Sequence, residues 1–327
     1  MIGWYAHHQG AGHLSRAMVV AARMTSPVTI LSSAPRPDHW PVERWVPLPM
    51  DDSAGGLDHT AGGVLHWAPL RNEGYAERMA DIARWVRRER PQLLVTDVSA
   101  EVGLLGRLLG VPVVVFLMAG DRSDRAHEIS YDAATALVAP WPAEAGLVTG
   151  WRPGWAAKAT FVGALSRFDE RVARPAPGAR HVTLLWGRGG SVVTDTDIDA
   201  ARAATPGWTW TVCSGAGPDE VWEGLQSADV VVAHSGQNVI AEVAAARRRA
   251  VIIAQPRPHD EQAHLVRSLA AAGLAHGCLG WPDAEQWPGL LESAVPTDPA
   301  RWSWWSDGHG ADRCAAHLER LAAGGWS

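Results

Sequence analysis

The stretch that most constrains this chain is residues 230–275, which read VVVAHSGQNVIAEVAAARRRAVIIAQPRPHDEQAHLVRSLAAAGLA. Its first four residues form a short apolar run, typical of a strand buried on both faces of a parallel sheet. A turn follows, and apolar residues then recur at helical spacing over residues 238–246. Residues 251–254 predict the next strand. The order strand, turn, helix, strand predicts an α/β domain with a parallel sheet.

The turn between this strand and helix has the properties of an anion site. Ser235 and Gly236 make it tight, and the backbone N–H groups of the following helix lie at the positive end of the helix dipole. His234 can add a ring N–H and Ser235 a hydroxyl. We therefore expect phosphate to bind here. The loop after the second strand places Glu261 and Gln262 at the same edge of the sheet, where open α/β sheets bind ligands.

The pattern His-x-Gly-x-Asn-x-x-x-Glu, followed 19 residues later by Glu-Gln, resembles the donor-binding box of GT-B fold glycosyltransferases. It is similar to the box of enzymes that glycosylate small molecules. It is also similar to that of the enzyme that adds N-acetylglucosamine to the lipid-linked peptidoglycan precursor. The resemblance implies that His234 and Asn238 meet the diphosphate and Glu242 the ribose hydroxyls. It also implies that Glu261 and Gln262 bind the sugar hydroxyls.

Each residue of this box also has a structural explanation. A His after a buried strand is often a satisfied structural histidine. A Glu in the first helical turn is often only a favourable partner of the helix dipole. The joint spacing of the box and the Glu-Gln loop favours the functional interpretation.

The start of the chain repeats the same logic. MIGWYA predicts a short strand, and HHQGAGHLSRAMVVAARM predicts a glycine turn that opens a helix. Gly10 and Gly12 permit a close approach of the backbone. The Gly-His pair resembles the first loop of the same superfamily, which implies that His13 is the catalytic base. At most one of His7 and His8 points to the ligand edge, because alternate residues at a strand end face opposite sides.

A buried strand is predicted over residues 92–96 and ends in Asp97. PQLLVTDVSAEV resembles the element of small-molecule glycosyltransferases in which an Asp orients the catalytic His, so the resemblance implies that Asp97 is the partner of His13. The alternative is that Asp97 caps the helix predicted at residues 102–109, a frequent role of Asp. One carboxylate could serve both purposes.

Other segments provide weaker candidates. Gly189 and Gly190, in GRGGS, resemble the glycine turn that faces the donor phosphates. Loops rich in Pro, Asp and Gly cover residues 34–63, and the segment AGDRSDRAHEIS combines five charges with a His in no recognised pattern. The acceptor-side candidates of the first half are Trp40, Trp45, His59 and His66.

The length of 327 residues is natural for two domains. Strands and helices alternate through both halves without hairpin signals, which predicts two Rossmann-like, doubly wound domains facing each other across a cleft. We expect an N-terminal acceptor-binding domain at residues 1–165 and a C-terminal donor-binding domain at residues 166–327. The resemblance implies that the last helix crosses back to the first domain.

Composition excludes several classes of function. The net charge of −6 and the lack of a long basic block argue against nucleic-acid binding. The short arginine runs at residues 87–90 and 247–249 are predicted to be solvated helix ends. The three cysteines have no metal-ligand spacing, which favours free thiols in a reducing compartment.

The location expected from the sequence is cytoplasmic. MIGWYAHHQG has no signal-peptide pattern, and no run of eighteen apolar residues occurs. Eighteen tryptophans include a cluster at Trp302, Trp304 and Trp305. That cluster is either core packing or an interfacial anchor, so membrane contact is at most peripheral.

The resemblance implies an inverting glycosyl transfer from a nucleotide sugar, which is a co-substrate rather than a cofactor. A uridine diphosphate sugar is the expected donor, with thymidine diphosphate sugars as the rival. A bound metal is unnecessary where a helix N-terminus meets the diphosphate, and we expect no Asp-x-Asp motif to hold one. The acceptor is a small molecule, a lipid-linked sugar or a glycan. A nonhydrolysing sugar-nucleotide epimerase and a noncatalytic nucleotide-sugar-binding protein remain as alternatives.

Overall fold

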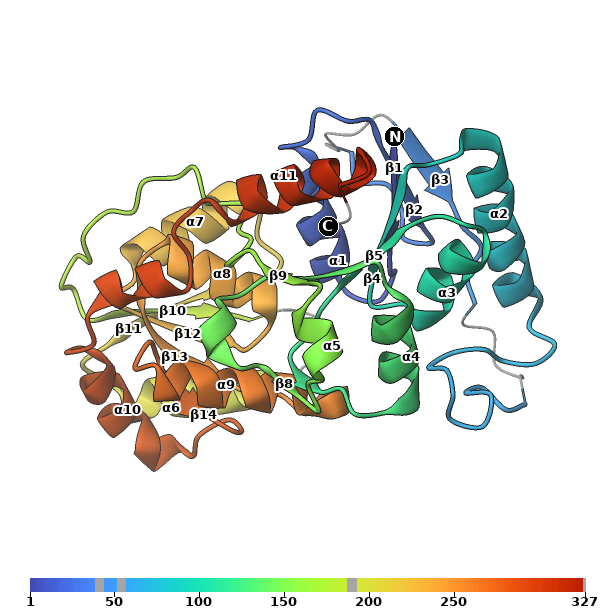
Figure 1. Ribbon diagram of the computed structural model, residues 1–327. Helices are drawn as coiled ribbons and strands as arrows, with labels where there is room; N and C mark the ends of the chain where they lie inside the picture. The colour runs from blue at the N-terminus through green and yellow to red at the C-terminus, as the bar shows by residue number, and fades with distance from the viewer. Residues whose placement is uncertain (39–43, 52–56, 187–192, 326–327) are drawn as a thin grey trace. The chain divides into compact units, whose positions relative to one another are not determined.

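The structure is a computed structural model, which describes residues 1–327 except 39–43, 52–56, 187–192 and 326–327. The predicted donor residues Gly189 and Gly190 and the acceptor-side candidate Trp40 lie outside the described residues. The chain divides into two compact units (Figure 1). Unit 1 consists of Met1–Pro140, Val148–Val162 and Gly310–Ser327. Unit 2 consists of Trp141–Leu147 and Gly163–His309.

Unit 1 is built on a seven-stranded sheet in the order β3-β2-β1-β4-β5-β7-β9, in which every neighbouring pair is parallel. Its strands are β1 (Ile2–Ala6), β2 (Val28–Ser32), β3 (Arg44–Pro47), β4 (Leu93–Asp97), β5 (Val113–Phe116), β7 (Ala136–Ala139) and β9 (Ala159–Phe161). A separate parallel pair is formed by β6 (Gly120–Asp121) and β8 (Val148–Thr149). The helices are α1 (Ala11–Ala21), α2 (Glu73–Glu89), α3 (Ala100–Leu108), α4 (Arg125–Ala133), α5 (Pro153–Ala156) and α11 (Gly310–Ala322).

Strand β1 lies where the strand order of unit 1 reverses. It pairs with β2 on one side and with β4 on the other, and Ala6 is in register with Asp97. Every residue of β1 and β4 is buried, as expected for parallel strands covered on both faces. The carboxyl ends of β1 and β4 therefore meet at the switch point of the sheet, where ligands of open α/β sheets bind.

Unit 2 contains a five-stranded parallel sheet in the order β11-β10-β12-β13-β14. Its strands are β10 (His181–Leu185), β11 (Thr209–Cys213), β12 (Val230–His234), β13 (Arg249–Ile253) and β14 (His276–Cys278). The helices are α6 (Asp195–Ala204), α7 (Pro218–Ser227), α8 (Gln237–Ala245), α9 (Glu261–Ala271) and α10 (Trp287–Ala294), with short 3-10 turns η1 (Ala143–Ala145), η2 (Pro258–Asp260), η3 (Ala284–Gln286) and η4 (Pro299–Trp304). The predicted doubly wound α/β class is confirmed for each unit.

Tryptophans contribute much of the core of unit 2. Trp186, Trp208 and Trp287 belong to one buried apolar cluster. In the cluster near the C-terminus, Trp302 and Trp305 are buried, and Trp302 donates its ring N–H to the carbonyl of Arg248 at 2.7 Å. Packing within unit 2 therefore accounts for these two rings. No helix in the described part of the chain has the length and apolar character needed to cross a membrane.

The prediction that the arginines at residues 247–249 are solvated is wrong for Arg248, the middle residue of the run. Arg248 is 1% exposed. Its guanidinium donates to buried backbone carbonyls, among them those of Leu225 at 2.7 Å and Gln226 at 2.9 Å. The run therefore holds a buried cation that ties α8 to the end of α7, because carbonyl oxygens replace the water that the charge loses.

The expectation that no Asp-x-Asp motif occurs is also corrected. Asp195 and Asp197 form one at the start of α6, and Asp197 and Asp199 form a second that overlaps it. The carboxylate of Asp197 accepts the backbone N–H of Thr194 at 2.8 Å and its hydroxyl at 2.7 Å, which completes a capping box. These bonds lower the pKa of Asp197. The motif therefore lies in the first turn of a helix that it helps to cap, a sufficient structural reason for its presence.

Candidate functional sites

In unit 1, polar side chains at the switch point converge on Asp97. This carboxylate ends β4 and is fully buried. Nδ1 of His13 lies 3.1 Å from Oδ1 of Asp97, and NH1 of Arg16 donates to the same oxygen at 2.8 Å. Positions 13 and 16 share one face of α1, so both side chains reach the same place. The structure brings His13 and Asp97 together and adds Arg16, which the sequence analysis missed.

The approach of His13 to Asp97 is close but is not aligned as a hydrogen bond. Within the described residues, neither Nδ1 of His13 nor Oδ2 of Asp97 has a hydrogen-bond partner. Because the two groups are already 3.1 Å apart, a small rotation of the imidazole would place Nδ1–H on the carboxylate. Nε2 of His13 would then be the ring nitrogen that accepts a proton.

Asp97 is held in its ionised form. Burial raises the pKa of this carboxyl, but Arg16 and then His13 oppose burial and hold the pKa below its ordinary value. Asp97 does not cap the following helix. Ser99 is the N-cap of α3 and accepts the N–H of Val102 at 3.2 Å. The capping alternative for Asp97 is therefore wrong.

The glycine loop of unit 1 opens α1. Gly10 is the N-cap and has φ of 85°, a conformation that favours glycine. Gly12 and His13 follow within the first turn of the helix. No side chain caps this helix, and its first turn has no acidic residue. The loop thus places His13 at the positive end of the helix dipole.

His7 lies in the same loop and has a defined tautomer. Its Nδ1 accepts the backbone N–H of Gln9 at 3.1 Å, and its ring stacks on His8 with centroids 4.6 Å apart. Burial, and then the neighbouring His8 and His13, lower the pKa of His7 to about 3. The ring is therefore neutral at neutral pH and carries its hydrogen on Nε2.

In unit 2, His234 has the same arrangement as His7. It ends β12, and its Nδ1 accepts the backbone N–H of Gly236 at 3.1 Å. Trp186 packs edge-on against its ring, with centroids 5.8 Å apart. Burial, followed by Arg257, lowers the pKa of His234 to about 4. His234 is therefore a neutral donor through Nε2 at the place predicted for the diphosphate.

Helix α8 begins directly after this turn. Gly236 is its N-cap, Asn238 lies in its first turn, and that turn has neither a side-chain cap bond nor an acidic residue. A Cβ on Gly236 would lie 2.7 Å from Cε1 of His234, so a larger residue here would force the imidazole ring to shift. The positive end of α8 thus keeps the character expected of an anion site.

Glu242 lies buried in an ion pair within unit 2. It is 7% exposed, and its Oε1 pairs with Nε of Arg167 at 2.8 Å. Burial raises the pKa of Glu242, and Arg167 opposes this rise. The sequence gives no local signal for this pair, because 75 positions separate its members. Arg167 therefore occupies one oxygen of the carboxylate that is predicted to bind ribose.

Ser235 and Gln262 connect the two loops of the predicted donor box. The amide oxygen of Gln262 accepts the N–H of Gln255 at 2.9 Å and the hydroxyl of Ser235 at 3.2 Å. Gln262 is 5% exposed, and these two hydrogen bonds occupy its amide oxygen in holding the two loops together. Glu261 begins α9 directly after Asp260, and both Asp260, with φ of 51°, and His259, with φ of 61°, have a conformation that is unusual for a side-chain-bearing residue. Such strain is common at functional loops.

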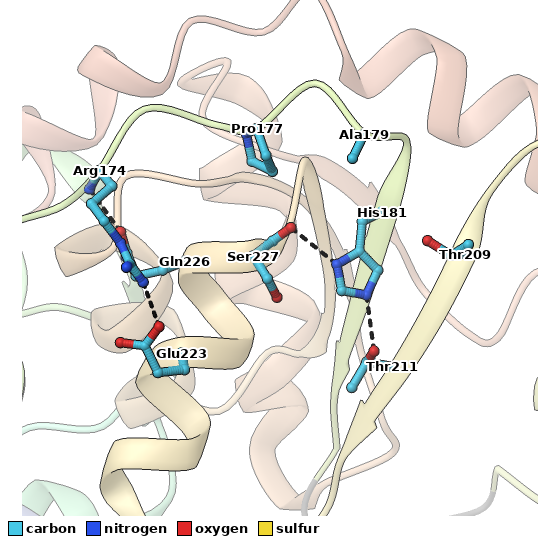
Figure 2. Close-up of a pocket in the computed structure, with 9 residues that line it drawn as sticks. All are labelled: Arg174, Pro177, Ala179, His181, Thr209, Thr211, Glu223, Gln226 and Ser227. Carbon is cyan, nitrogen blue, oxygen red and sulfur yellow. Dashed lines mark hydrogen bonds and ion pairs between the residues drawn. The ribbon is translucent and has the colours of Figure 1, made fainter.

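A cavity of unit 2 lies away from the predicted donor box (Figure 2). It measures about 610 Å³ and is lined in part by His181, Thr211 and Ser227. His181 is the first residue of β10, so the cavity opens at the amino edge of that strand. The ring of His181 is held by the carbonyl of Ser227 at 3.0 Å and the hydroxyl of Thr211 at 2.9 Å. Ligands of α/β sheets bind at the opposite edge, so we do not assign the donor to this cavity.

Comparison with solved structures shows that the chain has the GT-B fold of two Rossmann-like domains. It is similar to Phytolacca americana UGT2 complexed with UDP-2-fluoro-glucose and pterostilbene, with a TM-score of 0.68 and 13% identity over 99% of each chain. It is also similar to the glycosyltransferase VinC in complex with dTDP, with a TM-score of 0.63 and 15% identity over 98% of this chain and 99% of that one. For Acinetobacter baumannii MurG the TM-score is 0.63 and the identity 12%, over 98% and 99%. No protein-family model and no curated protein sequence matches the chain.

The buried ion pair between Arg16 and Asp97 leads us to predict an effect on the stability of unit 1. Asp97→Asn should lower the free energy of unfolding at pH 7 by about 3–5 kcal/mol, because Arg16 stays buried after losing this carboxylate. The folded pKa of Asp97 is depressed, so its contribution is present above the ordinary pKa of 3.8 and is lost as the pH falls below it. The difference between variant and wild type should therefore shrink below that pH.

Urea denaturation between pH 7 and pH 3 measures this difference. Asp199→Asn is the matched control, because Asp199 is an exposed partner of Arg202 and should change stability by less than about 1 kcal/mol. Equal stability of Asp97→Asn and wild type at pH 7, or a difference that stays constant into the acid range, would contradict the assignment.

Proposed function

We propose that this chain is an inverting glycosyltransferase that moves a sugar from a nucleoside diphosphate sugar to an acceptor hydroxyl. The observation that supports this most directly is the 3.1 Å approach of His13 to the buried, ionised Asp97. A carboxylate beside an imidazole orients the ring and stabilises the charge that it gains as a base. The GT-B fold shared with UGT2 and VinC supports the same class of reaction.

In the proposed reaction, Nε2 of His13 takes the proton of the acceptor hydroxyl while Nδ1–H turns to Asp97. The acceptor oxygen forms a bond to the anomeric carbon from the face opposite the leaving group. The bond from that carbon to the diphosphate oxygen breaks, and the nucleoside diphosphate leaves with the electron pair. Attack from the opposite face inverts the configuration of the anomeric carbon.

The leaving diphosphate is assigned to the turn of unit 2. The N–H groups at the start of α8, the side chain of Asn238 and Nε2–H of His234 are donors suited to developing negative charge. Glu242 is assigned to the ribose hydroxyls, with Arg167 holding one carboxylate oxygen. Glu261 and the amide nitrogen of Gln262 are assigned to the sugar hydroxyls.

The donor is predicted to be a uridine diphosphate sugar rather than a thymidine diphosphate sugar. Glu242 and the Glu261-Gln262 pair match the ribose and hexose contacts that the resemblance implies for uridine diphosphate sugars. Thermal shifts measured with uridine and thymidine diphosphates at equal concentration test this choice. Greater stabilisation by thymidine diphosphate would reverse it, and VinC is a fold relative whose structure holds dTDP.

Transfer is predicted to persist in excess EDTA. The diphosphate site proposed here consists of a helix N-terminus and a neutral imidazole, and Asp197, which both Asp-x-Asp motifs of α6 share, is engaged in capping. Rates with and without chelator, after dialysis, measure the effect. Complete loss of transfer that Mg²⁺ or Mn²⁺ restores would refute this prediction.

Substitutions in the two units are predicted to change different constants, kcat for unit 1 and nucleotide affinity for unit 2. His13→Ala should lower kcat by roughly 10²-fold or more, the scale of a lost general base, and should leave uridine diphosphate binding near wild type. Glu242→Ala should mainly weaken nucleotide binding, by about 1.5–3 kcal/mol for a lost charged acceptor. The two losses fall on different constants because His13 belongs to unit 1 and Glu242 to unit 2.

Calorimetric titration with uridine diphosphate and initial rates at saturating donor test both variants. Arg167→Ala is a useful companion to Glu242→Ala, because it removes the ion pair and keeps the carboxylate. Loss of nucleotide binding in His13→Ala, or unchanged binding in Glu242→Ala, would show that the assigned roles are wrong.

A further inference from the structure

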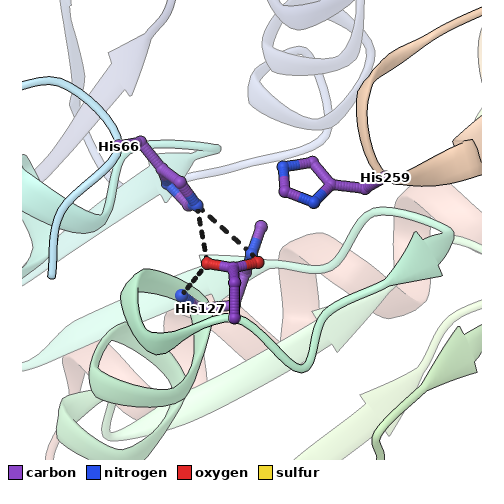
Figure 3. A group of neighbouring side chains, drawn as sticks. His66, His127 and His259 are labelled. Carbon is purple, nitrogen blue, oxygen red and sulfur yellow. Dashed lines mark hydrogen bonds and ion pairs between the residues drawn. The ribbon is translucent and has the colours of Figure 1, made fainter. Parts of the chain in front are cut away.

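Three other side chains of unit 1 converge on one point (Figure 3). Nε2 of His66 lies 3.2 Å from Oδ1 of Asp124 and 3.2 Å from Nδ1 of His127. Nδ1 of His127 also contacts Oδ2 of Asp124. His259, which Figure 3 also draws, belongs to unit 2. The group within unit 1 is thus two imidazoles and one carboxylate, each with a ligand atom turned to the others.

The spacing of these atoms is that of ligands around one metal ion. Bonds of about 2.0–2.1 Å to a tetrahedral zinc ion place neighbouring ligand atoms about 3.3 Å apart. The two imidazole nitrogens are 3.2 Å apart. At this distance one nitrogen can donate a hydrogen bond to the other, and a cation bound to both would take the place of that hydrogen.

The backbone holds these side chains in place without an ion. Oε1 of Glu101 accepts the N–H groups of His66 at 2.8 Å and of Trp67 at 3.0 Å, which fixes the loop that contains His66. Asp124 is the N-cap of α4 and accepts the N–H of His127 at 3.2 Å. The three side chains are therefore positioned by secondary structure and by the buried carboxylate of Glu101, as preorganised metal ligands are.

Arg122 determines where the hydrogen of His127 lies in the absence of an ion. Its Nε and NH2 donate to the carbonyls of Met118 and Ala119, and its NH1 lies 3.0 Å from Nε2 of His127. A guanidinium only donates, so Nε2 accepts and the ring hydrogen is on Nδ1. An ion has to displace this hydrogen before it binds Nδ1. Arg122 therefore opposes metal binding, and its removal should strengthen it.

We propose that His66, Asp124 and His127 form a binding site for a first-row transition-metal dication, of which zinc is the representative. Imidazole ligands suit zinc, nickel and copper ions, whereas Mg²⁺ and Ca²⁺ select oxygen ligands. Three protein ligands leave a further position for water or for a ligand atom. The bound ion joins the loop of His66 to the start of α4. This assignment does not depend on the proposed glycosyl transfer.

Calorimetric titration of the chelator-treated, dialysed full chain with Zn²⁺ tests the site in the absence of donor and acceptor. We expect one ion per chain and a rise in Tm on binding. His66→Ala and Asp124→Ala should each weaken binding at least about tenfold, and Arg122→Met should tighten it. The matched control is His59→Ala, an exposed histidine of the same loop, which should bind as wild type does.

Several results would overturn the proposal. One is the absence of saturable Zn²⁺ binding in both wild type and Arg122→Met. Another is unchanged affinity in His66→Ala, and a third is tighter binding of Mg²⁺ than of Zn²⁺. His66→Gln and Asp124→Asn replace the alanine variants if circular dichroism shows that those do not fold. Because no donor is present, a negative result here leaves the transferase proposal intact, and a positive result does not support it.

Discussion

Parallel strand pairing is the constraint on which both candidate sites depend. In a parallel sheet every strand ends at the same edge, so side chains that follow different strands meet there. Pairing of Ala6 with Asp97 brings the loop after β1 to the end of β4 in unit 1. Pairing of His234 with Ile253 does the same for the two loops of the donor box in unit 2. An antiparallel β4 would have placed Asp97 at the opposite edge from His13.

Local features of the candidate sites could be predicted from the sequence, and contacts between distant segments could not. The turn from His234 to Gly236 is encoded within three residues, and the structure explains its glycine by the closeness of the His234 ring. Arg16 was missed because its partner, Asp97, lies 81 positions away. The structural use of Gln262 was missed for a related reason, since its bonds to Ser235 and Gln255 exist only when two loops lie side by side.

Patterns of charge were the least reliable guide, because a charged residue can be solvated or buried with partners. The run that contains Arg248 suggests a solvated helix end, yet backbone carbonyls surround its guanidinium. The group around Asp124 has no recognisable spacing, because His66 comes from a loop 58 residues earlier in the chain. Burial and backbone geometry, which depend on the whole fold, decide such cases.

The two histidine turns each hold an uncharged imidazole in one orientation. Nδ1 of His7 and of His234 each accepts a backbone N–H two residues later, at 3.1 Å. Protonation of Nδ1 would set a second N–H against that donor, so each turn favours the neutral ring, in keeping with the lowered pKa values of both. Each ring then offers one hydrogen bond through Nε2 and no net charge. If the unit 2 turn binds a diphosphate as proposed, the attraction comes mainly from the backbone dipoles of α8, which do not titrate.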